Sequence, residues 1–251
     1  MKVAVYTVAY NEAHNAIDWC NSIFKEHHVG DEAVVADMGS QDMTKLTLSS
    51  RGTRVYLAPV RPFRFDIARN TALSLVSPDV DCCICLDLDE RLSEGWRDAV
   101  EEAWAQGGNY SFINYQYAPG IEFIDGRRVH SRFGWRWRYP AHEGLFSYGI
   151  TAIQTQPIEL RPFIYHKQDF EKDRSQYLGM LKIGLDENPD SHRMLHYYGR
   201  ELFYRKRYAE ALPILEKYYM VKPANYSNPW EENAHAEIIA VCRRACNVAT
   251  P

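Results

Sequence analysis

The chain has 251 residues, of which 46% are hydrophobic and 25% are charged, and its formal net charge is −4. This hydrophobic fraction excludes an intrinsically disordered protein, and the length allows one or two domains with a sizeable core. The slightly acidic balance argues against a protein that coats nucleic acid non-specifically. No apolar run approaches the roughly 18–20 residues of a membrane helix, and the first residues do not resemble a signal peptide, so we expect a cytoplasmic protein.

The six cysteines bear on the redox environment. They form no Cys-x-x-Cys pair and no zinc-ligand spacing, and three of them fall in the string CCIC at 82–85, inside an apolar run. This pattern predicts buried, reduced thiols of a cytosolic protein.

Up to about residue 107, strand patterns alternate with helical patterns. Apolar, β-branched runs predict strands at 2–8, 32–37, 54–59 and 81–90, and apolar residues at helical spacing predict helices at about 14–27, 42–51, 63–76 and 93–106. Ser93 is the expected cap of the last of these helices. The alternation predicts right-handed βαβ units on a mostly parallel sheet, in which ligands bind beyond the carboxyl ends of the strands.

The pattern changes twice after residue 107. Short aromatic strands are predicted at 110–117, 128–139 and 158–166, and helices at 171–187, 191–205, 208–221 and 231–246. Gly199, Ala211 and Pro223 follow one another at intervals of twelve, which matches the small and closing residues of one tetratricopeptide repeat. We therefore predict an α/β domain at 1–168 and an all-α, tetratricopeptide-like segment at 169–251.

Two carboxylates lie at the end of the apolar strand predicted at 81–90. Asp87 and Asp89 stand one residue apart in the string DLDE, at the edge of the predicted core. Carboxylates in such a place repel each other and resist desolvation, so a cation is expected between them. Hard divalent ions such as Mn²⁺ and Mg²⁺ prefer these oxygen ligands and share them with phosphates. The alternative is an ordinary acidic turn.

Three further motifs lie near strand ends. The string TVAYNE at 7–12 offers backbone groups and an amide to a nucleobase, and Asp37 in VADMGSQD is placed to accept hydrogen bonds from a ribose. Arg69 in the string ARN has a planar donor fork that suits a diphosphate. Each motif alone also fits a structural role, as a loop, a helix cap or a surface arginine.

Together the motifs resemble a known family. Six strings carry the resemblance: YNE, ADMGSQD, ARN, DLDE, AHE at 141–143 and YHK at 165–167. Their order and spacing resemble those of the inverting, family-two glycosyltransferases of the GT-A fold, in the branch with C-terminal tetratricopeptide-like helices. The resemblance covers about residues 2–225. It implies a nucleotide-sugar donor, with UDP favoured, and a divalent Mn²⁺ or Mg²⁺ on its diphosphate. Met38 and Lys167 depart from the pattern of the branch, which bears on the donor sugar.

The resemblance also implies roles for individual residues. Asp87, Asp89 and His166 match the metal and sugar ligands, and Glu143 matches the general base that deprotonates the acceptor hydroxyl. His142, beside that base, is an alternative ligand or orients the base. The donor site is expected to contain Thr7, Ala9, Asn11, Glu12, Asp37, Arg69, Asp87 and Leu88.

Residues 127–138 form an arginine-rich, aromatic stretch just before Glu143. Five arginines, at 127, 128, 132, 136 and 138, alternate with Phe133, Trp135 and Trp137. Such residues cradle phosphates and stack on bases or sugars, so an acceptor surface is predicted that includes Arg136, Trp137, Arg138 and His142. The alternative is a β-ribbon with solvated arginines and buried tryptophans. The acceptor is left open between a saccharide, a protein and a modified DNA base.

Two other functions fit parts of the sequence. One is a non-catalytic scaffold, in which the α/β domain binds a nucleotide and the helices bind a protein. The other is a nucleotidyltransferase, which also uses Mg²⁺. A glycine-rich basic loop after the first strand is typical of the latter, and AYNEAHN at 9–15 has neither glycine nor lysine.

Overall fold

The computed structural model describes residues 1–150, 152–167, 175–223 and 229–246, and it divides into two compact units. The α/β unit comprises Met1–Arg138 and Glu143–Lys172, and the helical unit comprises Tyr139–His142 and Asp173–Pro251. The chain therefore enters the helical unit for four residues before it returns to the α/β unit at Glu143. The predicted boundary between residues 168 and 169 lies outside the described residues.

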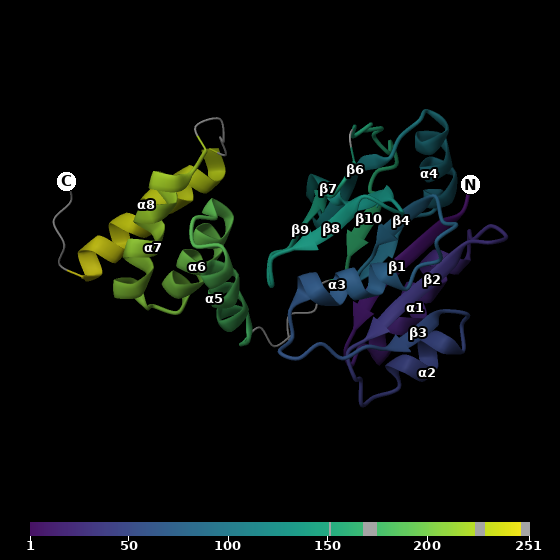
Figure 1. Ribbon diagram of the computed structural model, residues 1–251, viewed down its shortest axis with the longest axis horizontal. Coiled ribbons are helices and arrows are strands. Elements are labelled where there is room, and N and C mark those ends of the chain that lie inside the picture. The colour runs from purple at the N-terminus through teal and green to yellow at the C-terminus, as the bar shows by residue number, and fades with distance from the viewer. Residues whose placement is uncertain (151, 168–174, 224–228, 247–251) are drawn as a thin grey trace. The chain divides into compact units, whose positions relative to one another are not determined.

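An eight-stranded sheet forms the centre of the α/β unit, in the order β3-β2-β1-β4-β7-β6-β10-β5 (Figure 1). Its strands are β1 (Val3–Ala9), β2 (Glu32–Asp37), β3 (Arg54–Leu57), β4 (Cys82–Cys85), β5 (Glu90–Leu92), β6 (Tyr110–Ala118), β7 (Ile121–Ser131) and β10 (Ile164–His166). β3, β2, β1 and β4 are parallel, whereas β7 is antiparallel to both β4 and β6. The α/β fold with a parallel set of strands is thus confirmed.

Helices cover both faces of the parallel strands. Along β1 and β4, alternate residues pack into two separate apolar clusters, with Val5 and Ile84 in one and Ala4 and Cys83 in the other. Strands buried on both faces are expected to be continuously apolar, which explains the string CCIC. The helices of this unit are α1 (Ala13–Phe24), α2 (Thr44–Ser49), α3 (Phe65–Ser74) and α4 (Trp96–Ala105). α1 packs on the first cluster and α3 on the second.

Several predicted boundaries are wrong. The strand predicted at 81–90 is two strands, β4 and β5, which a turn at residues 86–89 separates. Ser93 does not cap α4, because the helix begins three residues later and its N-cap is Gly95, with φ of +86°. The backbone N–H of Ser93 instead donates to the carbonyl of Phe163 at 3.1 Å.

The predicted strand at 128–139 is also interrupted. β7 ends at Ser131, and the chain turns at Gly134, where φ is +85°, before β8 (Trp135–Arg138). β8 pairs antiparallel with β9 (Gly144–Ser147), and together they form a two-stranded ribbon. In the predicted strand at 158–166, only Ile164–His166 has strand geometry.

The helical unit contains α5 (Tyr177–Glu187), α6 (His192–Tyr204), α7 (Tyr208–Val221) and α8 (Pro229–Ala245). The first residues of the helix predicted at 171–187 lie outside the described residues. α6 and α7 approach closely at Gly199, where an added Cβ would lie 2.7 Å from the Leu215 side chain. All six cysteines are free thiols; five are buried and Cys246 is partly exposed. Within the described ranges, no helix has the length and apolar character needed to cross a membrane.

Candidate active site

The parallel strands bring Thr7, Arg69 and Asp87 together at their carboxyl ends. Asp87 lies in the turn after β4, beside the end of β1. Its two carboxylate oxygens accept hydrogen bonds from Nη1 and Nη2 of Arg69 at 2.6 and 2.9 Å. Thr7 donates to the same carboxylate at 3.3 Å. The planar arginine fork thus fixes the orientation of Asp87.

Arg69 also reaches Glu143. Its Nε donates to Oε1 of Glu143 at 2.6 Å, and its Nη1 donates to the Cys85 sulfur at 3.0 Å. The arginine is 4% exposed and lies 5.1 Å from the centre of the Trp137 ring. Burial acts to lower the pKa of the guanidinium, but Asp87, Cys85 and Glu143 outweigh burial and raise it well above its ordinary value. Arg69 is therefore a permanent cation that joins two predicted site carboxylates.

Glu90 and Arg128 form a second ion pair, and both contact Asp87. Glu90 is 2% exposed, and one carboxylate oxygen accepts from the Asp87 backbone N–H at 2.8 Å. The other accepts from Arg128 and from the Tyr115 hydroxyl, at 2.7 and 2.8 Å. Burial, opposed by Arg128 and assisted by Asp87 and Asp89, raises the pKa of Glu90 to about 7. The sequence analysis placed Arg128 in the arginine-rich stretch of the predicted acceptor surface, and it predicted no role for Glu90 or Tyr115.

His166 lies beside Asp89. β10 pairs antiparallel with β5 so that His166 is opposite Glu90, which brings the imidazole to the turn at 86–89. Its Nε2 is 3.5 Å from Oδ2 of Asp89, and its buried Nδ1 has no hydrogen-bond partner among the described residues. Burial acts to lower the pKa of His166, but Asp89, Glu90 and Asp87 outweigh burial and raise it.

Asp89 and His166 fit the protein side of a divalent-metal site. A carboxylate and an imidazole are both suitable ligands for Mn²⁺, and diphosphate oxygens and water commonly complete such a shell. In the described part of the chain, no group of three or more His, Cys, Asp or Glu is arranged to hold a metal by itself. Asp87 is held by Arg69 in this structure, so its role as a metal ligand stays a prediction.

The predicted donor residues on the first two loops form one hydrogen-bonded rim. The Asn11 amide oxygen accepts from the Gln41 N–H at 2.8 Å, and the Asn11 N–H donates to the Ser40 hydroxyl at 2.9 Å. Ala9 accepts from the Met38 N–H at 2.8 Å. These bonds tie the loop after β1 to the loop after β2.

Asp37 and Glu12 also hold this rim. The Asp37 carboxylate accepts from the Gly39 and Ser40 N–H groups and from the Ser40 hydroxyl, at 3.0, 2.9 and 2.6 Å. The Glu12 N–H donates to the Thr44 hydroxyl at 2.7 Å. Asp37 is thus engaged by its own loop, and its contact with a ribose stays a prediction.

The Leu88 side chain is buried in the core cluster that also contains Trp19 and Ile84. Its carbonyl accepts from the buried Arg91 at 2.6 Å, and the same guanidinium group donates to the Glu90 carbonyl at 2.7 Å. Arg91 also donates to the Asn15 carbonyl at 3.2 Å. Arg91 therefore links α1 to the turn that contains Asp87 and Asp89. The sequence analysis did not single out this arginine.

The ribbon of β8 and β9 separates its arginines from its tryptophans. Arg136 and Arg138 are exposed, whereas Trp137 is buried and its indole N–H donates to the Tyr6 hydroxyl at 2.7 Å. The side chain of Asn70 bonds both the N–H and the carbonyl of Trp137, each at 2.9 Å. The exposed part of the predicted acceptor surface is therefore Arg136 and Arg138.

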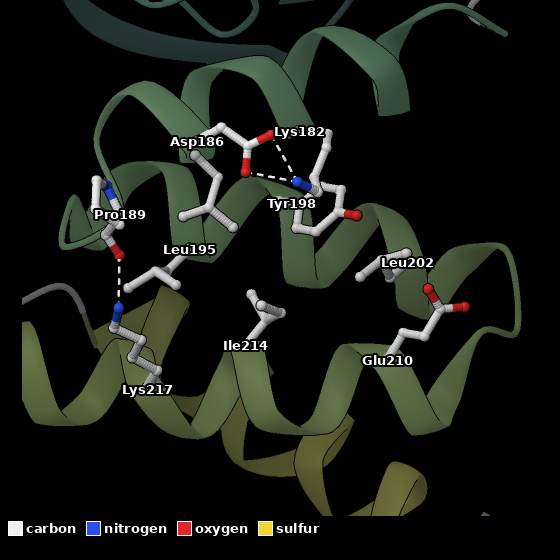
Figure 2. Close-up of a pocket in the computed structure, with 10 residues that line it drawn as sticks. Lys182, Asp186, Pro189, Leu195, Tyr198, Leu202, Glu210, Ile214 and Lys217 are labelled. Carbon is white, nitrogen blue, oxygen red and sulfur yellow. Dashed lines mark hydrogen bonds and ion pairs between the residues drawn. The ribbon is translucent and has the colours of Figure 1, made fainter.

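His142 and a further pocket belong to the helical unit. The His142 ring stacks on Tyr197 of α6. A pocket of about 400 Å³ lies between α5, α6 and α7. Figure 2 shows the residues that line it, among them the ion pair of Lys182 and Asp186. None of the predicted site residues lines this pocket.

Solved structures with a similar fold match almost the whole chain. The S. aureus TarS fragment 1–349 in complex with UDP gives a TM-score of 0.61 at 12% identity, over 98% of this chain and 91% of that one. The chain has the GT-A fold. The same fragment in complex with UDP-GlcNAc gives a TM-score of 0.58 at 11% identity, over 98% and 81% of the two chains.

One further solved structure gives a weaker match. M. tuberculosis glucosyl-3-phosphoglycerate synthase, in complex with Mn²⁺, UDP and glucosyl-3-phosphoglycerate, gives a TM-score of 0.48 at 18% identity, over 71% of this chain and 75% of that one. No family model matches the sequence, and no curated protein is significantly similar to it.

Proposed function

We propose that the chain is a metal-dependent glycosyltransferase of the inverting, family-two type. It transfers a sugar from a nucleoside diphosphate, with UDP favoured, to an acceptor hydroxyl. The observation that carries this proposal is the bond network in which Arg69 joins Asp87, at the carboxyl end of the parallel strands, to Glu143. In a sheet of this kind, that edge is where a nucleotide binds. The shared fold with TarS, which was crystallised with UDP and UDP-GlcNAc, supports the same donor.

The donor would occupy the rim formed by the loops after β1 and β2. Asn11 and Asp37 lie there, and Asp89 and His166 lie at the turn after β4 and beside it. Asp89 and His166 would hold a divalent cation, Mn²⁺ or Mg²⁺. When bound, that cation would neutralise charge on the leaving diphosphate without a proton transfer.

Glu143 is proposed as the general base. One of its oxygens accepts a hydrogen bond from Nε of Arg69 at 2.6 Å, so the carboxylate is held in one orientation. An ionised, oriented carboxylate can take the proton of an acceptor hydroxyl as that oxygen attacks the sugar. General-base assistance contributes about 10²–10⁴ in rate. Attack from the face opposite the diphosphate inverts the anomeric centre.

The acceptor would approach over the ribbon of β8 and β9. Arg136, Arg138 and Phe146 lie on its outer face, and the guanidinium of Arg138 lies 5.2 Å from the centre of the Phe146 ring. Glu143 directly precedes β9, so this face adjoins the proposed base. Exposed arginines favour an acceptor that carries negative charge, whether it is a saccharide, a protein or DNA.

The test of this function is release of nucleoside diphosphate. Wild-type protein is incubated with a panel of nucleotide sugars and Mn²⁺. We expect UDP release that stops with a chelator, falls by about 10²–10⁴ in Glu143→Gln, and falls in Asp89→Asn. Arg207→Ala, which removes an exposed ion pair with Glu210, is the matched control.

Each competing function has its own result. Release of a sugar 1-phosphate, with transfer of the nucleoside monophosphate, in place of a nucleoside diphosphate would favour a nucleotidyltransferase. Metal-independent nucleotide binding without turnover across the panel would favour the scaffold, in which the helical pocket of Figure 2 would be the protein-binding surface. The tetratricopeptide-like character of the helical unit and the cytoplasmic location stay predictions.

A further inference from the structure

The segment that precedes Glu143 is built into the helical unit. Tyr139–His142 packs with the helical unit, whereas Arg138 before it and Glu143 after it belong to the α/β unit. Glu143 therefore takes its backbone position directly from His142, through one peptide bond. Whatever fixes His142 also restricts the carboxylate that we propose as the base.

Two residues of α6 fix His142. Arg193 donates from Nε and Nη2 to the His142 carbonyl, at 3.0 and 2.8 Å. That carbonyl belongs to the peptide bond shared with Glu143. The Tyr197 ring stacks on the His142 imidazole, with 3.9 Å between ring centroids and 6° between ring planes. Arg193 and Tyr197 are four residues apart, so they lie on one face of the helix.

The backbone of this segment needs such support. His142 has φ of +50° and Tyr139 has φ of +80°, in the left-handed region that residues with a Cβ rarely adopt. A conformation of this kind persists only where the surroundings determine it, and it is concentrated at functional sites. α5 contributes as well, because an added Cβ at Gly184 would lie 3.0 Å from the Pro140 ring. The segment is thus held at its middle and at its end.

We propose that Arg193 and Tyr197 are positioning residues for Glu143. They hold the carbonyl and the side chain of His142, and so restrict the backbone directly before the proposed base. This proposal rests on the proposed function.

The first experiment measures the support itself. Hydrogen–deuterium exchange of peptides spanning residues 139–146 is compared between wild type, Arg193→Ala, Tyr197→Leu and the control Arg207→Ala. We expect faster exchange in this segment for the first two variants, with wild-type exchange in β1 and β4. Unchanged exchange at 139–146 overturns the proposal, whether or not the protein turns over a donor.

The second experiment measures catalysis. In Arg193→Ala and Tyr197→Leu we expect kcat for UDP-sugar hydrolysis to fall by about tenfold to a hundredfold, because displacing a catalytic group by about 1 Å has effects of this size. The Kd of UDP with Mn²⁺, from calorimetry, is expected to stay within about twofold of wild type. Tyr197→Phe keeps the stacked ring and is expected to restore most of the activity.

The third experiment separates positioning from stability. If Arg193 acts through Glu143, then Arg193→Ala adds less than about a twofold loss when Glu143 is already Gln, because the two residues act as a unit. The proposal is overturned if the loss of kcat in the double variant equals the product of the two single-variant losses. It is also overturned if Arg193→Ala lowers kcat and UDP affinity by the same factor, because both results show a general structural role. A wild-type protein that neither binds UDP nor releases it refutes the proposed function, while the exchange experiment still decides whether α6 holds the segment.

Discussion

Replacing Arg69 is the sharpest test of the proposed site. Arg69→Met removes the cation that pairs with Asp87 and Glu143 but keeps a side chain of similar length. Breaking a buried ion pair by removing one partner costs about 3–5 kcal/mol. The carboxylates of Asp87 and Glu143 are 27% and 13% exposed, and Arg128 still lies 3.4 Å from Asp87. We therefore expect the lower end, about 3 kcal/mol, in the free energy of unfolding.

Arg69→Lys tests the geometry separately from the charge. A lysine ammonium is a single point of donation and cannot fork onto Asp87 while also reaching Glu143. It keeps the positive charge, so we expect about half the loss, roughly 1–2 kcal/mol. An outcome in which the lysine variant is as stable as wild type would show that charge alone matters and that the fork is dispensable.

The assay is urea unfolding followed by tryptophan fluorescence. Five of the six tryptophans lie in the α/β unit, at positions 19, 96, 104, 135 and 137, so the signal reports chiefly on that unit. With an m value of about 2 kcal/mol/M, a loss of about 3 kcal/mol lowers the midpoint by about 1.5 M. Arg207→Met is the control and should leave the midpoint unchanged. A wild-type midpoint for Arg69→Met would refute the argument that these pairs hold the site.

Three further predictions concern other parts of the chain. Burial acts to raise the pKa of Asp31, but hydrogen bonds from Arg97, Val3 and His28 outweigh burial and lower it. The free energy of unfolding should therefore fall as the pH drops below about 4, and Asp31→Asn should make urea midpoints depend less on pH in that range. On α5 and α6, Gly179→Ala meets open space, whereas Gly199→Ala meets Leu215, so the second should be less stable than the first by about 1–3 kcal/mol in circular dichroism melts. Arg136→Ala combined with Arg138→Ala should reduce transfer to an acceptor more than donor hydrolysis; equal losses would place these arginines at the donor or in the fold.

The sequence predicted the parallel strands and their helices because those patterns are local. An apolar run such as CCIC and the helical spacing at 63–76 depend on residues that are near in sequence. Segment ends were predicted less well. The Ser93 cap was wrong because the backbone of that residue pairs with Phe163, about seventy positions away, and no local pattern carries this contact.

The partners of the site residues could not be predicted for the same reason. Five arginines occur at 127–138, and the sequence does not show that the side chain of Arg128 turns inward. The antiparallel register of β7, with Val129 opposite Ile84, brings Arg128 beside the turn after β4 and pairs it with Glu90. The burial of Trp137 likewise depends on Tyr6 and Asn70, which come from distant segments.

The charge balance of the site explains why a donor and a cation would bind together. Among the described residues, five carboxylates share this corner with two guanidiniums and one imidazole: Asp87, Asp89, Glu90, Asp125, Glu143, Arg69, Arg128 and His166. The negative groups outnumber the positive ones even when Glu90 is neutral and the imidazole is protonated. Arg69, which the sequence assigned to the diphosphate, is already engaged by two of these carboxylates. A diphosphate would therefore add negative charge to a site that is already negative, and Coulomb repulsion at such short range is large in a partly buried environment. A divalent cation at Asp89 and His166 reverses that balance, so in the proposed enzyme we expect UDP affinity to depend strongly on Mn²⁺ and to weaken in Asp89→Asn, even though UDP itself is unchanged.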